Sequence, residues 1–411
     1  MHAPGTSPTG VETATRHALG WLVFGNSVGL FLAILLVEPQ WQLGELSYGR
    51  WVPLHLNSQL YGWTALPLVA WLLQLYEVDA CKFRTWGPAA VWAWTAALAF
   101  ACLLWLKGES SGKIFLDWRG GSLQAFVVAL VILWAVLFVS WWNRASGWSR
   151  LRVRVALAGL VVLAMVPLMM VMASSPKTYP PVDPTTGGPL GSSLMGSTLL
   201  VVVLMLMLPR AAGIKGRGTA ISGTWWFFGF ALVVFGLAEA KGGGHYDWWQ
   251  MGAMLIELPW IWLIIYDWAG FQWPECARVW RKPVLFWWTL LSLTAVGMYF
   301  PGILDHIKFT QGLVAHSHLA MAAFTTSFCA MILSVITGRS IGSASSVYLW
   351  NVAVFIMLIT LATMGWHEGQ NAEWMIVPAT WRQAGLLARI ICGVFMLDAS
   401  VSWLIKHRTN S

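Results

Sequence analysis

The sequence predicts an all-α, polytopic membrane protein with twelve transmembrane helices and almost no extramembrane domain. Of its 411 residues, 58% are hydrophobic and only 10% are charged, against about 25% charged in an ordinary soluble domain. The mean hydropathy is +0.65, and the apolar residues gather in runs long enough to cross a bilayer. These values exclude a soluble enzyme, a disordered chain and a secreted disulfide scaffold.

The apolar runs define the predicted spans. A helix needs about 20 apolar residues to cross the hydrocarbon core, and the chain contains twelve such runs. The connections are short, so we expect a single transmembrane domain over 1–411, with a short polar N-terminus at 1–16. A Pro- and Gly-rich outer loop at 175–191 follows the fifth span. The predicted spans are 17–38, 52–76, 87–106, 122–142, 153–174, 192–209, 222–240, 248–269, 284–302, 310–337, 347–366 and 383–405.

The distribution of Lys and Arg predicts that both termini are cytoplasmic. With twelve spans the termini share a side, and sixteen of the 25 Lys and Arg residues fall on that side. Eight fall on the opposite side, and Arg389 lies within the last span. Because positive residues concentrate in cytoplasmic loops, both termini are expected to be cytoplasmic. We also expect a multi-pass protein of the bacterial inner membrane. The net charge of +8 is then a topology signal, and it implies no nucleic-acid partner.

Histidines gather toward the membrane surface predicted to be outside. His55 lies about four residues into the second span, and His316 and His318 lie about seven to nine residues into the tenth. At 1.5 Å per residue these depths are similar, roughly 5–14 Å inside the outer boundary. The other histidines on the outer side are His245, His306 and His367, and those near the termini, expected to be exposed, are His2, His17 and His407.

Buried imidazoles at these depths suit the axial ligation of haem iron. Ionisable residues inside a membrane are costly, and they are candidates for function. Residues i and i+2 of a helix point about 200° apart, so His316 and His318 can ligate two haems, one on each face. His55 can complete the coordination of one haem, which leaves the other five-coordinate. The alternative is that these histidines are packing residues with satisfied hydrogen bonds, and spacing alone leaves both interpretations open.

Three segments resemble subunit I of the haem-copper oxidases, closest to the nitric oxide reductase and C-family oxidase branch. FTQGLVAHSHLAMAAF (Phe309–Phe324) resembles the family's tenth span, and WVPLHLNSQLYGW (Trp51–Trp63) resembles its second. GGGHYDWWQMGAMLIELPW (Gly242–Trp260) resembles the reductase segment that joins spans seven and eight. The count of twelve spans also matches the family core. The resemblance implies a haem-copper oxidase subunit I-like bundle.

The resemblance also implies the haem ligands. Carried over by position, His55 and His318 would ligate a low-spin haem, and His316 would be the proximal ligand of a high-spin haem. We therefore expect two haem cofactors of b type. Arg50, Arg382 or His367 could meet the haem propionates, and the alternative for each is a side chain that reaches the membrane interface.

The ligands of the family's second metal are missing from the expected positions. The family binds copper or non-haem iron through one His on span six and two adjacent His after span seven, but span six has no His here. After span seven at most His245 remains, and with Glu239 or Asp247 it could form a weak remnant site that the nearby Lys241 opposes. Copper or iron needs about three imidazole or carboxylate ligands. We therefore expect neither copper nor non-haem iron, and we expect the second-metal site to be lost.

Glu257 is a further candidate for catalysis beside His316. It lies within the eighth span and matches an acidic position of the reductase segment. A buried carboxylate can hold and release a proton, and a structural hydrogen-bonding role is the alternative.

The resemblance implies a dihaem redox protein of a respiratory chain. Electrons would pass from a periplasmic cytochrome c-type donor through the low-spin haem to the high-spin haem, which would reduce oxygen or nitric oxide. The alternative is a non-catalytic haem electron-transfer or anchor subunit of a larger redox complex. A haem-free transporter has no support beyond the helix count. Because the five Cys form no C-x-x-C-H motif, the donor is expected to be a cytochrome c-type subunit or a soluble protein, and other membrane subunits are expected partners.

Overall fold

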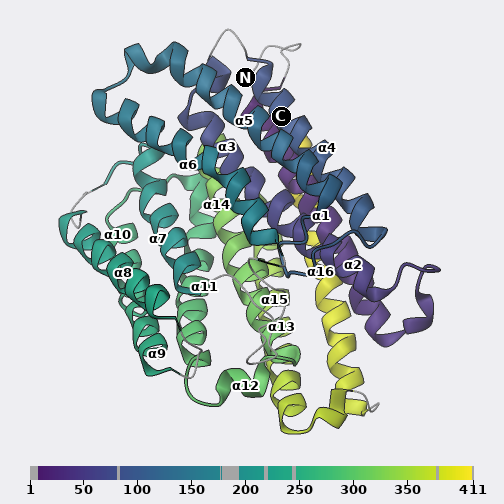
Figure 1. The fold of residues 1–411 in the computed structure, drawn as a ribbon. Helices are drawn as coiled ribbons and strands as arrows, with labels where there is room; N and C mark the ends of the chain where they lie inside the picture. Colours follow the sequence, from purple (N-terminus) through teal and green to yellow (C-terminus); the bar gives the residue numbers. More distant parts are fainter. Residues whose placement is uncertain are drawn as a thin grey trace. The chain divides into compact units, whose positions relative to one another are not determined.

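The computed structural model describes residues 8–80, 84–175, 177, 194–216, 221–242, 247–375 and 379–409. The described residues are almost entirely helical, with no β-strand among them (Figure 1). The chain divides into two compact units, and each is described by itself below. Unit 1 comprises Met1–Leu190, Ile332–Ser346 and Gly393–Ser411, and unit 2 comprises Gly191–Met331 and Val347–Cys392.

The predicted all-α fold is confirmed, because each of the twelve predicted spans lies on a helical segment of the described residues. In unit 1 these segments are α1 (Gly10–Val37), α2–η2–α3 (Tyr48–Asn57, Ser58–Thr64, Ala65–Leu75), α4 (Trp86–Leu106), α5 (Gly120–Arg144) and α6 (Arg150–Ser174). In unit 2 they are α7 (Leu194–Ala211), α8 (Ile221–Lys241), α9–η5–α10 (Trp248–Met254, Leu255–Glu257, Pro259–Ala269) and α11 (Glu275–Met298). Segments that contribute to both units are α13–η6–α14 (Gln311–His318, Leu319–Thr325, Thr326–Thr337), α15 (Ala344–Gln370) and α16 (Thr380–Thr409). The short connecting helices are η1 (Pro39–Trp41), η3 (Val78–Ala80), η4 (Ala145–Gly147), α12 (Ile303–Ile307) and η7 (Ala372–Met375).

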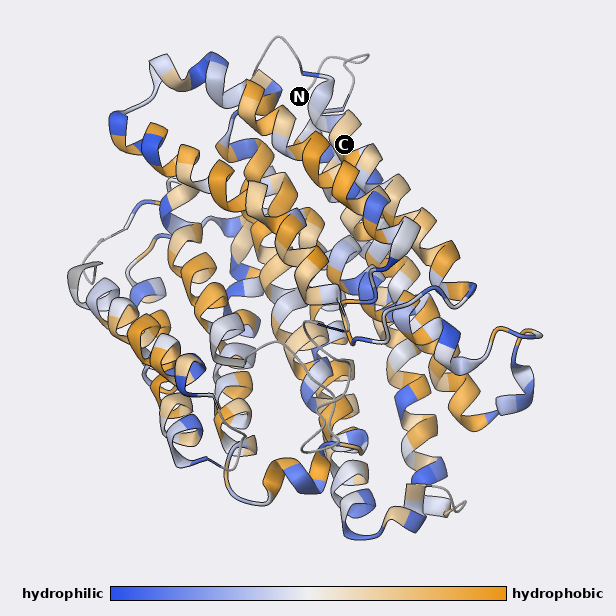
Figure 2. Ribbon diagram, in the orientation of Figure 1, coloured by the Kyte–Doolittle hydropathy of each residue, from blue (hydrophilic) through white to orange (hydrophobic). Residues whose placement is uncertain are grey.

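Length and composition show that the chain is a multi-pass membrane protein. Among the described residues, nine helices are long and apolar enough to cross a membrane. Apolar residues cover the middle of the helices, and polar residues lie mainly toward their ends (Figure 2). On α6, the share of the span buried inside the protein is only 11%, so most of its apolar surface is available to lipid. The start of α1 and the end of α16, both in unit 1, lie at the same end of that unit (Figure 1).

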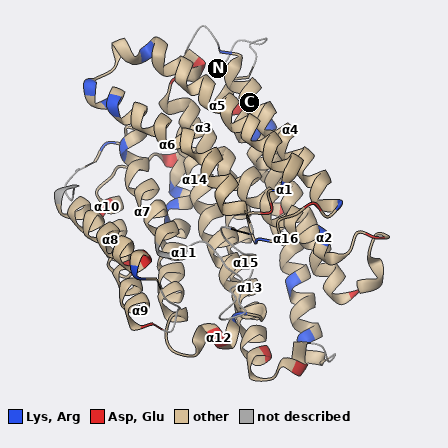
Figure 3. Cartoon of the chain, in the orientation of Figure 1, with Lys and Arg blue, Asp and Glu red and all other residues tan. Residues whose placement is uncertain are grey.

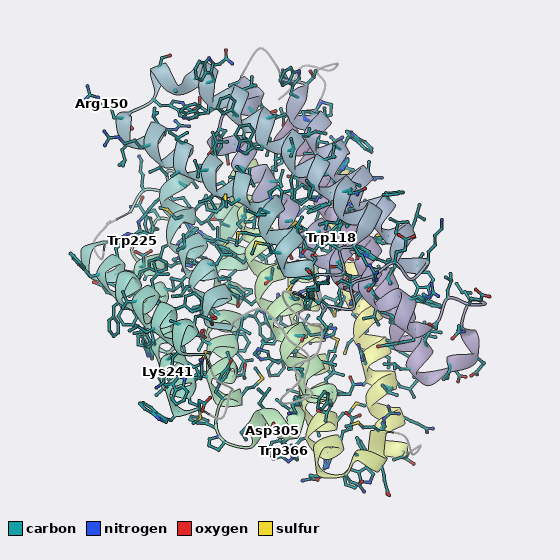
Figure 4. The ribbon with its side chains drawn as sticks, in the orientation of Figure 1. Trp118, Arg150, Trp225, Lys241, Asp305 and Trp366 are labelled. Atoms are coloured by element: carbon teal, nitrogen blue, oxygen red, sulfur yellow. The ribbon has the colours of Figure 1, made fainter. Side chains whose placement is uncertain are left out.

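Arginines concentrate at the turn between α5 and α6, which belongs to the side predicted to be cytoplasmic (Figure 3). The Glu77 carboxylate accepts from two of them, Arg144 at 3.2 Å and Arg152 at 2.7 Å. The Arg152 guanidinium also lies 4.1 Å from the centre of the Trp148 ring. Arg150 projects from the same turn (Figure 4). The Glu77 carboxylate thus neutralises part of the positive charge at the turn between α5 and α6.

The loop between α4 and α5 is anchored by buried side chains of unit 1. Trp118 is only 1% exposed and stacks on Phe126 with ring centres 4.3 Å apart (Figure 4). The Asp117 carboxylate accepts hydrogen bonds from Asn57 Nδ2 at 2.9 Å and from Ser110 Oγ at 2.8 Å. Burial raises the pKa of Asp117, which is 3% exposed.

Lys113 in the same loop reaches the end of α6. Its ammonium donates to the carbonyl oxygens of Ala173 and Ser175. The last carbonyls of a helix have no partner within the helix and carry its negative dipole end, so a cation there is favourable. The loop and α6 are thereby tied together.

The expectation that His17 and His407 are exposed is wrong. His407 is 6% exposed, and His17 is half-buried with its Nδ1 atom 2.7 Å from Thr95 Oγ1. The cause is helix length, because α1 begins at Gly10 and α16 continues to Thr409, beyond the predicted spans at both ends. Both histidines therefore lie on packed helix faces of unit 1. His2 lies outside the described residues.

Candidate functional site

His55 is held by a hydrogen bond to the neighbouring helix of unit 1. Its Nδ1 atom lies 2.9 Å from the carbonyl oxygen of Gly25 on α1. A carbonyl oxygen can only accept, so Nδ1 carries the proton and the lone pair of the neutral ring is on Nε2. Metal-binding histidines usually donate their second ring N–H to a carbonyl or a carboxylate in this way. The arrangement therefore fits an imidazole that ligates iron through Nε2.

His318 in unit 2 shows the same arrangement within its own helix. Its Nδ1 atom lies 2.8 Å from the carbonyl oxygen of Val314, one turn earlier on α13. By the same argument Nδ1 donates and Nε2 carries the lone pair. Two of the three predicted haem ligands thus have a defined tautomer that suits coordination.

His316 faces a different partner from His318. Its Nδ1 atom lies 3.5 Å from Thr294 Oγ1 on α11, which is a long contact. The Thr294 hydroxyl donates to the Leu290 carbonyl at 2.9 Å, so its oxygen is left to accept from the imidazole. The two histidines of the H-x-H motif are thereby directed to separate surroundings, as their spacing along the helix requires.

A π-helical segment follows each of the two hydrogen-bonded histidines. The segment η2 begins three residues after His55, and η6 begins directly after His318. Extended π-helices are rare and often occur at functional sites. In unit 2, the Thr326 hydroxyl donates to the Met321 carbonyl at 2.9 Å and so satisfies a backbone group of this segment. No local sequence signal predicted either segment.

Glu257 is buried, as predicted, in the short segment η5 between α9 and α10. The residue is 1% exposed, and its two carboxylate oxygens have no hydrogen bond of good geometry in the described residues. The Thr198 hydroxyl of α7 is the polar group that faces the carboxylate. Glu257 is therefore a buried carboxyl group that faces a hydroxyl, which suits either a proton-holding role or a structural hydrogen bond.

The position of the possible second-metal remnant is only partly described. Glu239 lies exposed near the end of α8, and His245 lies outside the described residues. The Lys241 ammonium lies 3.7 Å from the centre of the Trp249 ring, so the aromatic face stabilises its charge (Figure 4). Within the part of the chain that the structure describes, no three His, Cys, Asp or Glu side chains gather as a metal site. The expected loss of the second-metal site stays a prediction, because His245 lies outside the described residues.

The other candidates have protein partners. Arg50 donates from Nη1 to the Leu106 carbonyl at 3.1 Å and closes the end of α4. Arg382 lies 3.6 Å from the Glu368 carboxylate, and His367 packs near Trp374 and Trp381 with ring centres 5.8 and 5.4 Å away.

The Glu368 carboxylate belongs to a polar network at the start of α13. Its Oε2 accepts the Gln311 backbone N–H at 2.8 Å, and Arg389 Nη1 donates to the Gln311 side-chain oxygen at 3.2 Å. The sequence placed Arg389 within the last span, and this network explains how its charge is accommodated. The network fixes the end of the helix that carries His316 and His318.

No family model and no curated protein matches the chain. Among solved structures, it is similar to a haem-copper terminal oxidase that was determined as a dimer. The TM-score is 0.57 at 9% sequence identity, and the similarity covers 98% of this chain and 84% of that chain. The chain therefore has the fold of a haem-copper terminal oxidase.

Proposed function

We propose that this chain is a membrane redox protein of the haem-copper oxidase superfamily that holds two b-type haems. In this proposal His55 and His318 are the axial ligands of a low-spin haem, and His316 is the proximal ligand of a high-spin haem. The observation that carries the proposal is that His55 and His318 have the same kind of hydrogen bond and the same kind of helix after them. Each donates from Nδ1 to a backbone carbonyl, and each is followed by a π-helical segment.

The residues present fit haem and supply its orientation. Haem iron provides one-electron transfer where both axial positions are filled, and binding of a small oxidant where one is open. The Gly25 and Val314 carbonyls fix the tautomers of His55 and His318 and raise their basicity. Buried Glu257 would hold a proton for the reduction of oxygen or nitric oxide. The electron donor would be a cytochrome c-type subunit or a soluble cytochrome.

The second candidate is a non-catalytic haem protein that carries electrons or anchors a larger redox complex. One specific observation favours it: the predicted sixth span contains no His, although the family draws a ligand of the second metal from there. Without a second metal, the high-spin haem would lack the partner that the family uses for its chemistry. Retention of His316 argues that the second haem itself remains.

Purified protein tests the proposal. We expect two haems per chain and no stoichiometric copper or additional iron. His55→Ala and His318→Ala should each remove the low-spin visible bands. His306→Ala is the matched control, because His306 is also predicted on the outer side and has no proposed role at either haem. Unchanged low-spin bands in both ligand variants would refute the assignment.

Steady-state turnover separates the two candidate functions. Reduction of oxygen or nitric oxide by the dihaem protein would identify a reductase, and its absence with intact haems would identify an electron-transfer or anchor subunit. A third metal at full occupancy would overturn the expected loss of the second-metal site.

A further inference from the structure

We infer that Gly29 on α1 is a positioning residue that sets the orientation of the His55 ring, an inference that rests on the proposed haem ligation. The α1 helix contains the sequence Gly25-Asn26-Ser27-Val28-Gly29, in which two glycines lie four residues apart. Small residues at this spacing let two membrane helices approach closely. The helix that approaches α1 in unit 1 is the one that carries His55.

Three close contacts mark this approach, and each has a glycine on one side. A Cβ atom on Gly62 would lie 2.6 Å from Trp21 Cβ, and one on Gly25 would lie 2.6 Å from Gln59 Nε2. A Cβ atom on Gly29 would lie 2.6 Å from His55 Cε1. Carbon atoms normally do not approach this closely, because attractive contact is optimal at about 3.5–4.0 Å. A methyl group at Gly25 would meet the flexible end of Gln59, which can move, whereas at Gly62 and Gly29 it would meet the base of Trp21 and the His55 ring.

The contact at Gly29 differs from the other two because it meets the imidazole along one edge. The same Cβ atom would lie 3.1 Å from Nδ1 and 3.3 Å from Nε2 of His55. The ring is also fixed at Nδ1 by the Gly25 carbonyl, one turn earlier on α1. The ring thus lies against Gly29 while it donates to Gly25, so α1 contributes to both its position and its tautomer.

An added methyl group at residue 29 must therefore displace the ring. A displacement that relieves the contact with Cε1 changes the ring plane, lengthens the bond to the Gly25 carbonyl, or does both. The plane of an axial imidazole and the hydrogen bond at its other nitrogen tune the electronic state of haem iron. Gly29→Ala should therefore alter the low-spin haem without removing a ligand.

The experiment compares Gly29→Ala with two control variants. Gly20→Ala lies on the same helix, and a Cβ atom there meets nothing within 4 Å. Gly62→Ala creates an equally close contact in the same interface, but against Trp21 rather than the imidazole. The readouts are haem per chain, the α-band of the reduced low-spin haem, the ferric low-spin electron paramagnetic resonance signal and the midpoint potential.

We expect both haems to be retained in all three variants, with a shifted α-band, resonance signal and potential in Gly29→Ala alone. Wild-type values in Gly29→Ala would overturn the inference. The same shift in Gly62→Ala would also overturn it, since the effect would then come from helix packing in general. Low-spin bands that survive His55→Ala would instead refute the haem assignment itself, and the positioning role with it.

A second variant covers the case in which Gly29→Ala does not accumulate in the membrane. The double variant His55→Gly and Gly29→Ala removes the ring that the new methyl group meets. Recovery of accumulation in the double variant would support the contact as the cause. Failure of the double variant to accumulate, when His55→Gly alone does accumulate, would overturn it.

Discussion

The ion pair between Arg210 on α7 and Asp267 on α10 should contribute strongly to the stability of unit 2. The guanidinium makes two hydrogen bonds to the carboxylate, at 2.6 and 2.9 Å, and a third to the Leu206 carbonyl at 2.6 Å. The Asp267 side chain is 3% exposed and the Arg210 side chain is 18% exposed. The pair joins two helices whose residues are 57 positions apart in sequence.

Because the two side chains are buried to different extents, their removal should lower the free energy of unfolding by different amounts. Removing one partner of a buried pair costs about 3–5 kcal/mol, because a charge is left buried and uncompensated. Arg210→Met leaves the almost fully buried carboxylate, so we expect a cost in that range. Asp267→Leu leaves the more exposed guanidinium, which can turn toward water, so we expect about 2–3 kcal/mol. The double variant removes both charges and should recover most of the loss, since apolar replacements of buried pairs are often neutral.

The free energy of unfolding can be measured by titration with sodium dodecyl sulfate in mixed micelles, followed by the loss of helical circular dichroism. The control is the ion pair of Arg278 and Glu275 on α11, at 2.5 Å, whose side chains are 68% and 80% exposed. Glu275→Ala should cost about 0–1 kcal/mol. The reasoning is refuted if Arg210→Met costs no more than Glu275→Ala, or if the double variant is as unstable as the sum of the single ones.

Three further predictions concern the loop at Asp117, the second haem and the topology. Burial raises the pKa of Asp117 above its ordinary value of 3.8. The folded state therefore binds this proton more tightly than the unfolded state, which stabilises the fold fully below pH 3.8. The stabilisation is lost as the pH rises through the raised pKa of the folded state. The free energy of unfolding of the wild type should therefore fall, relative to Asp117→Asn, as the pH rises above about 4, and equal pH dependence would contradict this. His316→Ala should abolish carbon monoxide binding while the low-spin bands remain, and retained binding would show another proximal ligand. A reporter fused after Ser411 should read cytoplasmic, and a periplasmic signal would exclude the predicted orientation.

The positions of the helices could be predicted from the sequence because bilayer thickness alone demands long apolar runs. The ends of the helices do not follow from hydropathy, because α1 begins before its predicted span and α16 ends after its own. Thr9 begins α1 well before the apolar run, because its side chain accepts from the Glu12 N–H and caps the helix. Polar residues can extend a helix beyond the membrane, and hydropathy does not detect them.

Much of the candidate site could not be predicted because its contacts join residues distant in sequence. The sequence identified His55 and His318 by depth and resemblance, but their carbonyl partners depend on packing and rotamer. The Gly25–Gly29 spacing can be read from the sequence as a close helix contact, although it does not reveal which side chain lies there. The bond between Asn57 and Asp117 spans 60 positions and has no local pattern. The predictions for His245 remain predictions, because that residue lies outside the described part of the chain.

The two π-helical segments have a consequence for how this chain can be compared with others. A π turn closes its hydrogen bond over five residues instead of four, so it takes up about one residue more than an α turn. From His55 to the C-terminal end of its span, and from His318 to the C-terminal end of its own, the chain thus carries surplus length. When the chain is aligned with a protein that has an uninterrupted α-helix there, a residue-by-residue alignment shifts by about one position after each of these histidines, whereas a superposition of the backbones does not.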